Sequence, residues 1–172
     1  MSQILETIKT RRSARAYKDV QVAKQDLEAI LTAGLYASSA NNTQNWQFTV
    51  VQGEEKLTKL QKAVAKALGN PSYHRFYGAP TLVIVSAPES YSQAMADCSC
   101  ALENIFLAAH SLGVDSVWIN QLTDTYSDPD LRAVLTEFGV PADHQVCGCA
   151  ALGYAANPLP ADRENKGKIV YA

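Results

Sequence analysis

Three arginines and a serine stand close together near the start of the chain, in the order Arg11-Arg12-Ser13-Ala14-Arg15. Like charges held this close repel one another, and a bound anion would relieve that repulsion. A planar guanidinium group can donate two parallel hydrogen bonds to a phosphate, and the Ser13 hydroxyl adds another donor. The cluster therefore indicates a phosphate site. A solvated basic helix end, where the helix dipole favours cations, explains the same spacing equally well.

A second segment, residues 38–45, is rich in side-chain amides. Asn41, Asn42 and Gln44 each carry a hydrogen-bond donor and an acceptor on one group, which suits the edge of a planar heterocycle. An ordinary polar turn between two elements has the same composition, and for this segment alone it is the better interpretation.

Common sequence patterns for other chemistries are missing. The chain contains no G-x-G-x-x-G, P-loop, G-x-S-x-G or H-E-x-x-H sequence, and its three histidines are scattered. The cysteines form two C-x-C pairs, Cys98/Cys100 and Cys147/Cys149, without zinc-finger spacing. We therefore expect small buried cysteines in a reduced compartment, and no metal site.

Composition narrows the class of protein. Over 172 residues, 47% are hydrophobic and 19% charged, as in one globular domain spanning residues 1–172. The 15 Lys and Arg residues against 17 Asp and Glu residues leave a net charge of −2, which argues against nucleic acid or an anionic membrane as partner. The longest apolar run, residues 79–87, is too short to span a bilayer, and the first residues lack signal-peptide features. We expect a cytoplasmic protein.

Apolar periodicity predicts the elements that position these residues. Helices are expected around residues 4–8 and over 24–36, 54–68, 93–112 and 128–138; strands are expected over 47–51, 81–86, 114–120 and 145–152, with a terminal strand at 169–171. The helix over 93–112 is apolar on several sides and should be central to the core. Residues 156–168 should be irregular. The loose alternation of helices and strands predicts one α+β domain.

A series of short motifs, taken in chain order, resembles the motifs of the FMN-dependent nitroreductase family. They are R-R-S-x-R-x-Y at residues 11–17, A-S-S-A-N-N-T-Q-N-W at 37–46, Y-G-A-P at 77–80, D-x-x-x-A-x-E-N-x-x-L-A-A-x-x-L-G at 97–113, S-x-W-I at 116–119 and L-G-Y at 152–154. This ordered set covers nearly the whole chain. Ser38 and Asn45 stand where the family commonly has proline. The chain is also short for the family, with little room for an inserted helical lid over bulky substrates.

The resemblance implies a role for each part of the arginine cluster. Arg11 would hold the FMN phosphate, with Arg12 and Ser13 beside it. Arg15 would approach the pyrimidine edge of the flavin, near N1 and O2.

The amide-rich loop has a different implied role. Ser38, Ser39 and Asn42, with Gln44 as a neighbour, would reach a flavin bound mainly by the other subunit. The resemblance therefore implies a homodimer with FMN at its interface.

Further contacts are implied later in the chain. A backbone N–H at Asn120 or Gln121 would face flavin N5. Arg163, Lys166 or Lys168 would complete the phosphate site, with Arg163 ranked first and Lys166 next. Arg75 would be a second cationic contact to the ring.

The implied function is that of an oxidoreductase. NADH or NADPH would deliver hydride to FMN, and a nitroaromatic, quinone or similar flat acceptor would receive it in a ping-pong cycle. Because the cofactor carries the hydride, no catalytic side chain is expected. The implied fold is α+β, a central mixed or antiparallel sheet flanked by helices. The alternatives are a reductive dehalogenase or flavin-cleaving enzyme of the same fold, and a non-catalytic flavin-binding protein.

Overall fold

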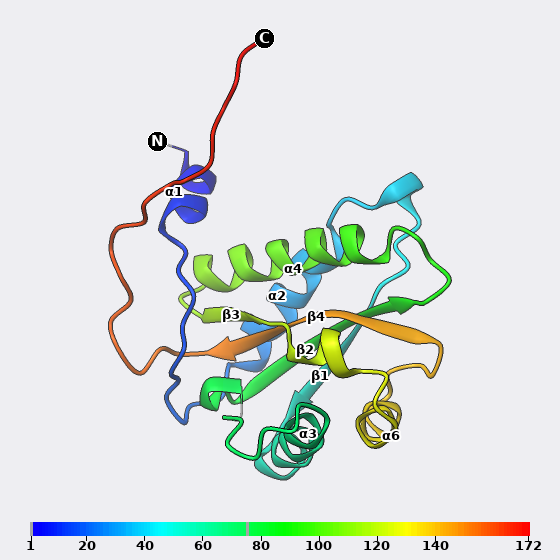
Figure 1. The fold of residues 1–172 in the computed structure, drawn as a ribbon. Coiled ribbons are helices and arrows are strands. Elements are labelled where there is room, and N and C mark those ends of the chain that lie inside the picture. Colours follow the sequence, from blue (N-terminus) through cyan, green and yellow to red (C-terminus); the bar gives the residue numbers. More distant parts are fainter. Residues whose placement is uncertain (1, 75) are drawn as a thin grey trace.

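A four-stranded antiparallel sheet in the order β1-β2-β4-β3 forms the centre of the fold (Figure 1). The computed structural model describes residues 2–74 and 76–172. The strands are β1 (Gln47–Gln52), β2 (Thr81–Pro88), β3 (Asp115–Ile119) and β4 (His144–Gly153). Of the two sheet types that the sequence left open, the structure has the antiparallel one, within the predicted α+β class.

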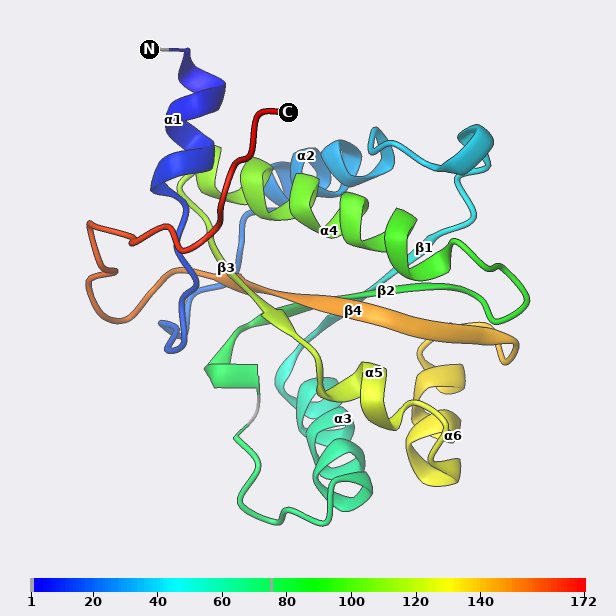
Figure 2. The same cartoon turned by 45° about the horizontal axis from the view of Figure 1, so that its top comes forward.

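Helices cover both faces of this sheet (Figure 2). They are α1 (Gln3–Thr10), α2 (Lys24–Leu35), α3 (Glu54–Ala67), α4 (Ala94–Ser111), α5 (Gln121–Thr125) and α6 (Pro129–Glu137), with two short 3₁₀ turns, η1 (Ala40–Asn42) and η2 (Phe76–Gly78). Helices α2 and α4 pack on one face, and α3, α5 and α6 on the other. Helix α1 stands at one end, beside the end of α4.

The two central strands are buried on both faces because helices cover both sides. In β2, Leu82 and Ile84 pack toward α3, α5 and α6, whereas Val83 and Val85 pack toward α2 and α4. This alternation is the two-residue period of a strand. Helix α4 contributes many of the fully buried side chains of the core between α2, α4 and the sheet, so the prediction of a central helix is confirmed.

The predicted elements up to residue 153 are all present, and their ends differ from the predictions by at most two residues. The predicted N-cap of α6 is also confirmed, because the Asp128 carboxylate accepts hydrogen bonds from the backbone N–H groups of Asp130 and Leu131 at 3.0 and 3.1 Å.

Two expectations were wrong, and one helix was not predicted. Residues 169–171 form no strand, because the tail runs past α1 and away from the sheet, with Tyr171 91% exposed. Helix α5 was not predicted, since its five residues are too few to show a period and only Leu122 is buried. Cys100 is exposed, unlike Cys98, Cys147 and Cys149, because two positions along a helix turn a side chain about 200° away from Cys98.

Within the described residues, no helix has both the length and the apolar character needed to cross a bilayer.

Gly148 of β4 gives a test of the packing between the sheet and α4. A Cβ at this position would lie 2.6 Å from Cζ2 of Trp118 and 2.8 Å from Cδ1 of Leu102. Because the indole ring cannot fold away, Gly148→Ala should lower the free energy of unfolding by about 1–3 kcal/mol in urea denaturation. The control is Gly167→Ala in the exposed tail, where nothing lies within 4 Å, and it should change stability by less than ~0.5 kcal/mol. Equal midpoints for Gly148→Ala and wild type would contradict this packing.

Candidate functional site

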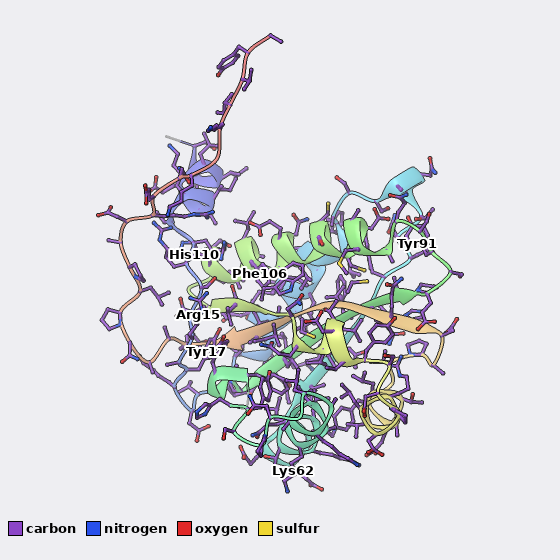
Figure 3. All side chains as sticks on the ribbon, viewed as in Figure 1. Arg15, Tyr17, Lys62, Tyr91, Phe106 and His110 are labelled. Atoms are coloured by element: carbon purple, nitrogen blue, oxygen red, sulfur yellow. The ribbon has the colours of Figure 1, made fainter. Side chains whose placement is uncertain are left out.

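The segment that carries the arginine cluster lies across one end of the sheet. Ser13 bridges to Ser116 of β3, and the N–H of Ala14 donates to the Ser116 carbonyl at 3.0 Å. Farther on, the N–H of Lys18 donates to the carbonyl of Tyr154, just past β4, at 2.8 Å. Helix α1 ends at Thr10, so Arg12 and Arg15 lie beyond the helix, in the segment that these bonds attach to the sheet. Arg15 therefore stands exposed at the sheet end (Figure 3).

Arg12 joins this segment to the tail of the chain. Its Nη1 donates to the carbonyls of Lys9 at 2.6 Å and Arg11 at 2.9 Å, and its Nη2 donates to the carbonyl of Ala161 at 2.7 Å. Its Nε is buried and has no hydrogen-bond partner. The guanidinium thus fixes the path of the tail, and its buried Nε is a donor that none of the described residues satisfies.

Two cavities lie between the N-terminal segment and the tail. The larger, of about 480 Å³, is lined by the cations Lys9, Arg12 and Arg163 and by the carboxylate of Asp162, so its charged lining is net positive. The smaller, of about 240 Å³, has six lining residues: Ser13, Arg15, Ala16, Asn157, Pro158 and Leu159. Arg12 and Arg163 thus line the larger cavity and Ser13 and Arg15 the smaller one, and we call these four residues the cationic end.

Arg11 turns away from these cavities toward α4. Its Nε lies 4.0 Å from a carboxylate oxygen of Glu103, and its guanidinium lies 5.9 Å from the centre of the Phe106 ring. With its side chain only 18% exposed, Arg11 packs against the helix. Its expected role as the main phosphate ligand stays a prediction.

The remaining predicted cations lie elsewhere. Lys166 is exposed in the tail, with its Nζ 3.8 Å from Glu164, and Lys168 is exposed nearby. Arg75 falls outside the described residues.

Tyr17 supports the segment below Arg15. Burial raises the pKa of Tyr17, the charge of Asp115 raises it further, and Arg15 acts in the opposite direction. The phenol therefore stays protonated and donates to the Ala151 carbonyl at 3.3 Å. Its ring covers Gly153, where a Cβ would lie 2.9 Å from Cδ1 of Tyr17. A side chain at Gly153 would push this support away from the sheet.

The two predicted residues after β3 begin helix α5. The side-chain amide of Asn120 donates to Asp124 at 3.1 Å. The side-chain oxygen of Gln121 is buried and has no hydrogen-bond partner among residues 2–74 and 76–172. The structure therefore leaves an unsatisfied acceptor at the end of β3.

The amide-rich loop lies at the other end of α4. Its turn η1 is attached through Ala40 to Asp97, near the start of α4, whereas Arg11 contacts Phe106. Those two helix residues are nine positions apart, roughly 14 Å along the axis. A single chain therefore does not bring Ser38, Ser39, Asn42 and Gln44 to the cationic end (Figure 1).

Two residues that organise this loop, Asp97 and Tyr91, were missed by the sequence analysis. Asp97 is the first residue of the motif at residues 97–113, but its position in the sequence alone indicated no role. Tyr91 is connected to the loop by a hydrogen bond that links residues far apart in sequence, to Thr43 at 2.8 Å.

The described residues fit the cofactor that the sequence resemblance implies. A net positive cavity matches a phosphate, and Arg12 and Gln121 each keep a buried polar atom that a bound group could satisfy. Among the side chains that the structure describes, no three His, Cys, Asp or Glu residues gather as metal ligands.

Comparison with known proteins gives consistent matches. The sequence model of the Nitroreductase family matches residues 8–154. A crystal structure of a nitroreductase with bound FMN from Bacteroides fragilis superposes with a TM-score of 0.95 at 44% identity, covering 100% of both chains. A protein of Archaeoglobus fulgidus, provisionally named NADH dehydrogenase/NAD(P)H nitroreductase, is 36% identical over 158 residues, which are 90% of this chain and 86% of that one. The nitrobenzene nitroreductase of Ectopseudomonas oleovorans is 27% identical over 213 aligned positions, covering 95% of this chain and 92% of that one.

Proposed function

We propose that this chain, which belongs to the Nitroreductase family, is an FMN-containing oxidoreductase that takes hydride from NADH or NADPH. The observation that carries this proposal is the full-length match to a nitroreductase with bound FMN. The cationic end, formed where the family motif R-R-S-x-R stands, supports it independently. The nicotinamide co-substrate is supported by the name of the Archaeoglobus fulgidus relative.

We propose nitroaromatics, quinones or similar flat molecules as acceptors. The named activity of the nitrobenzene nitroreductase relative supports the first class. That alignment extends over 213 positions, whereas this chain has 172 residues, so the relative carries insertions that this chain lacks. A site without such insertions should be open to solvent and should suit small, flat acceptors.

When bound, FMN supplies the hydride-accepting chemistry, and the residues of the chain bind, orient and tune it. Arg12 and Arg163 would hold the phosphate from the larger cavity. From the smaller cavity, Ser13 would donate a hydrogen bond, and Arg15 would place its positive charge at the pyrimidine edge of the ring. At the end of β3, Gln121 would offer its backbone N–H to the ring.

We also propose a homodimer with two interface sites. Helix α1 exposes 70% of Ile4, 50% of Leu5 and 45% of Ile8. Beside them, α1 and α4 border an apolar cavity of about 400 Å³. A second copy would cover this surface. It would also bring its amide-rich loop to a cationic end that the loop of the same chain does not reach. The cytoplasmic location expected from the sequence stays a prediction.

The purified protein should be yellow and should release FMN, not FAD, on denaturation, since the cationic end can bind one phosphate and no dinucleotide motif is present. Anaerobic mixing with NADH or NADPH should bleach the flavin absorbance, and adding a nitroaromatic or a quinone should restore it. A protein that binds FMN but keeps its colour with both nucleotides would be a flavin-binding protein without this activity. A protein that stays colourless with added FMN would contradict the functional assignment altogether.

Light scattering should give the mass of a dimer, twice 18.6 kDa. Ile8→Asp should weaken the dimer by at least about tenfold, since burying such a side chain contributes ~1.5–3 kcal/mol. Leu68→Asp is the matched control, because Leu68 is similarly exposed at 37% but follows α3, far from α1. A wild-type monomer that still reduces acceptors would exclude the interface sites.

Potentiometry can separate the roles of two arginines. A guanidinium at the pyrimidine edge stabilises the negative charge that two-electron reduction leaves there, through a charged hydrogen bond of ~1.5–3 kcal/mol. Arg15→Leu should therefore lower the midpoint potential of bound flavin by roughly 30–65 mV. Arg163→Leu, at the cavity proposed for the phosphate, should weaken FMN retention and leave the potential nearly unchanged. Loss of FMN from Arg15→Leu at an unchanged potential would show that Arg15 does not reach the ring.

A further inference from the structure

The amide-rich loop has an unusual backbone. Asn41, Asn42 and Gln44 have φ values of 51°, 55° and 52°, in the left-handed region, and none of them is glycine. Asparagine enters this region more readily than most residues, whereas glutamine has no such tendency. Three such residues within four positions persist only where the surrounding structure holds them, and this kind of strain is typical of functional sites.

A buried carboxylate on α4 holds one side of the loop. Asp97 is only 6% exposed. Its two oxygens accept the backbone N–H of Ala40 at 3.1 and 3.2 Å. Because Ala40 begins the turn η1, this shared hydrogen bond fixes the point from which the left-handed residues follow.

A tyrosine connects the same carboxylate to the far side of the loop. The hydroxyl of Tyr91 donates to Oδ2 of Asp97 at 2.5 Å and lies 2.8 Å from the hydroxyl oxygen of Thr43. A phenol has one proton, so with that proton on the Asp97 side the Thr43 hydroxyl is the donor to Tyr91. The hydrogen bond to Asp97 also raises the pKa of Tyr91, which keeps the phenol protonated.

The loop side chains are arranged inside this frame. The backbone N–H of Gln44 donates to the hydroxyl of Ser39 at 3.2 Å, and the side-chain amide of Gln44 donates to the amide oxygen of Asn42 at 2.8 Å. Ser39, Asn42 and Gln44 are three of the residues expected to reach the partner's flavin. Their relative positions therefore depend on a backbone that Asp97 and Tyr91 secure at Ala40 and Thr43.

Neither anchor can touch the flavin of its own chain. Asp97 is buried, and Figure 3 shows Tyr91 at the end of α4 opposite to Arg15. Both anchors are instead bonded to the loop, Asp97 to Ala40 and Tyr91 to Thr43. We propose that Asp97 and Tyr91 are positioning residues, which hold residues 39–44 in the strained shape that contacts flavin across the dimer interface. This inference rests on the proposed function, because the target of the loop is the partner's cofactor.

Hydrogen exchange measures the anchor directly, without flavin. Tyr91→Phe removes the one oxygen atom that joins Asp97 to Thr43, and Asp97→Asn removes the charge that Ala40 and Tyr91 share. In flavin-free protein, the amide of Ala40 should exchange about tenfold faster in Asp97→Asn, because a hydrogen bond to a charged acceptor becomes a weaker neutral one. Segment 39–44 should also exchange several-fold faster in Tyr91→Phe. The control is Ser99→Ala, which removes an α4 hydroxyl that donates to the Met95 carbonyl at 2.6 Å, and it should leave the loop unchanged.

Flavin binding and kinetics test the functional half of the inference. In the holoenzyme, Tyr91→Phe should raise the FMN dissociation constant and the KM for a nitroaromatic acceptor by roughly three- to tenfold. Its thermal midpoint without flavin should stay near that of Ser99→Ala. Faster loop exchange together with weaker FMN binding supports the positioning role. Unchanged loop exchange in Tyr91→Phe, or faster exchange with unchanged FMN binding and KM, overturns it.

The two proposals fail in different ways. A wild-type protein that does not bind FMN overturns the proposed function, and with it the claim that the loop serves a flavin. Hydrogen exchange in the same protein still reports whether the two anchors hold the loop. If Asp97→Asn does not fold, Tyr91→Phe alone decides the outcome, because it removes one atom from a side chain near the surface.

Discussion

The packing of α4 onto the central strands sets the distance between the two chemically distinct regions of this molecule. Ala101, Leu102 and Ile105 have no exposed surface, and they lie along α4 between Asp97 and Phe106. A helix whose inner face is buried in this way cannot tilt or slide without opening the core. The loop anchored at one end and the arginine segment packed at the other are therefore held apart by a rigid spacer.

The cationic end depends on contacts that the sheet and the tail make together. Its segment is hydrogen-bonded to Ser116 of β3 and to Tyr154 after β4, so its backbone position follows from the sheet. The tail has no regular structure, and Arg12 bonds to it at Ala161. In this way a single guanidinium both closes the cavity wall and contributes to its positive charge. That dual role explains how an irregular tail can border a specific site.

The loop region follows a different physical logic. A left-handed backbone at three non-glycine residues is unfavourable by itself, and a buried carboxylate with a tyrosine compensates by securing the loop on both sides. Two well-positioned regions at opposite ends of α4 are what the proposed site, shared between two copies, requires. The exposed apolar residues of α1, beside the end of α4, provide a surface on which the second copy could bind.

The sequence alone determined the elements and the family. Apolar periodicity is a local property, so the helix over 93–112 and the strand over 81–86 could be located to within two residues. The motif R-R-S-x-R likewise stands in a contiguous stretch, and its order relative to the later motifs sufficed to identify the family. Helix α5 was too short to show a period, and the terminal strand at residues 169–171 failed because a strand needs a neighbour that local pattern cannot supply.

Only the tertiary structure decided which charges meet. Arg12 bonds to a carbonyl 149 positions away, and Asp97 anchors an amide 57 positions away. No local sequence pattern predicts contacts between residues so far apart in the chain. It was the fold that turned Arg11 toward α4 while leaving Arg12 and Arg163 on the cavity. Adjacent arginines have the same local chemistry, and their surroundings differ only because the packed helix and the returning tail approach them from different sides.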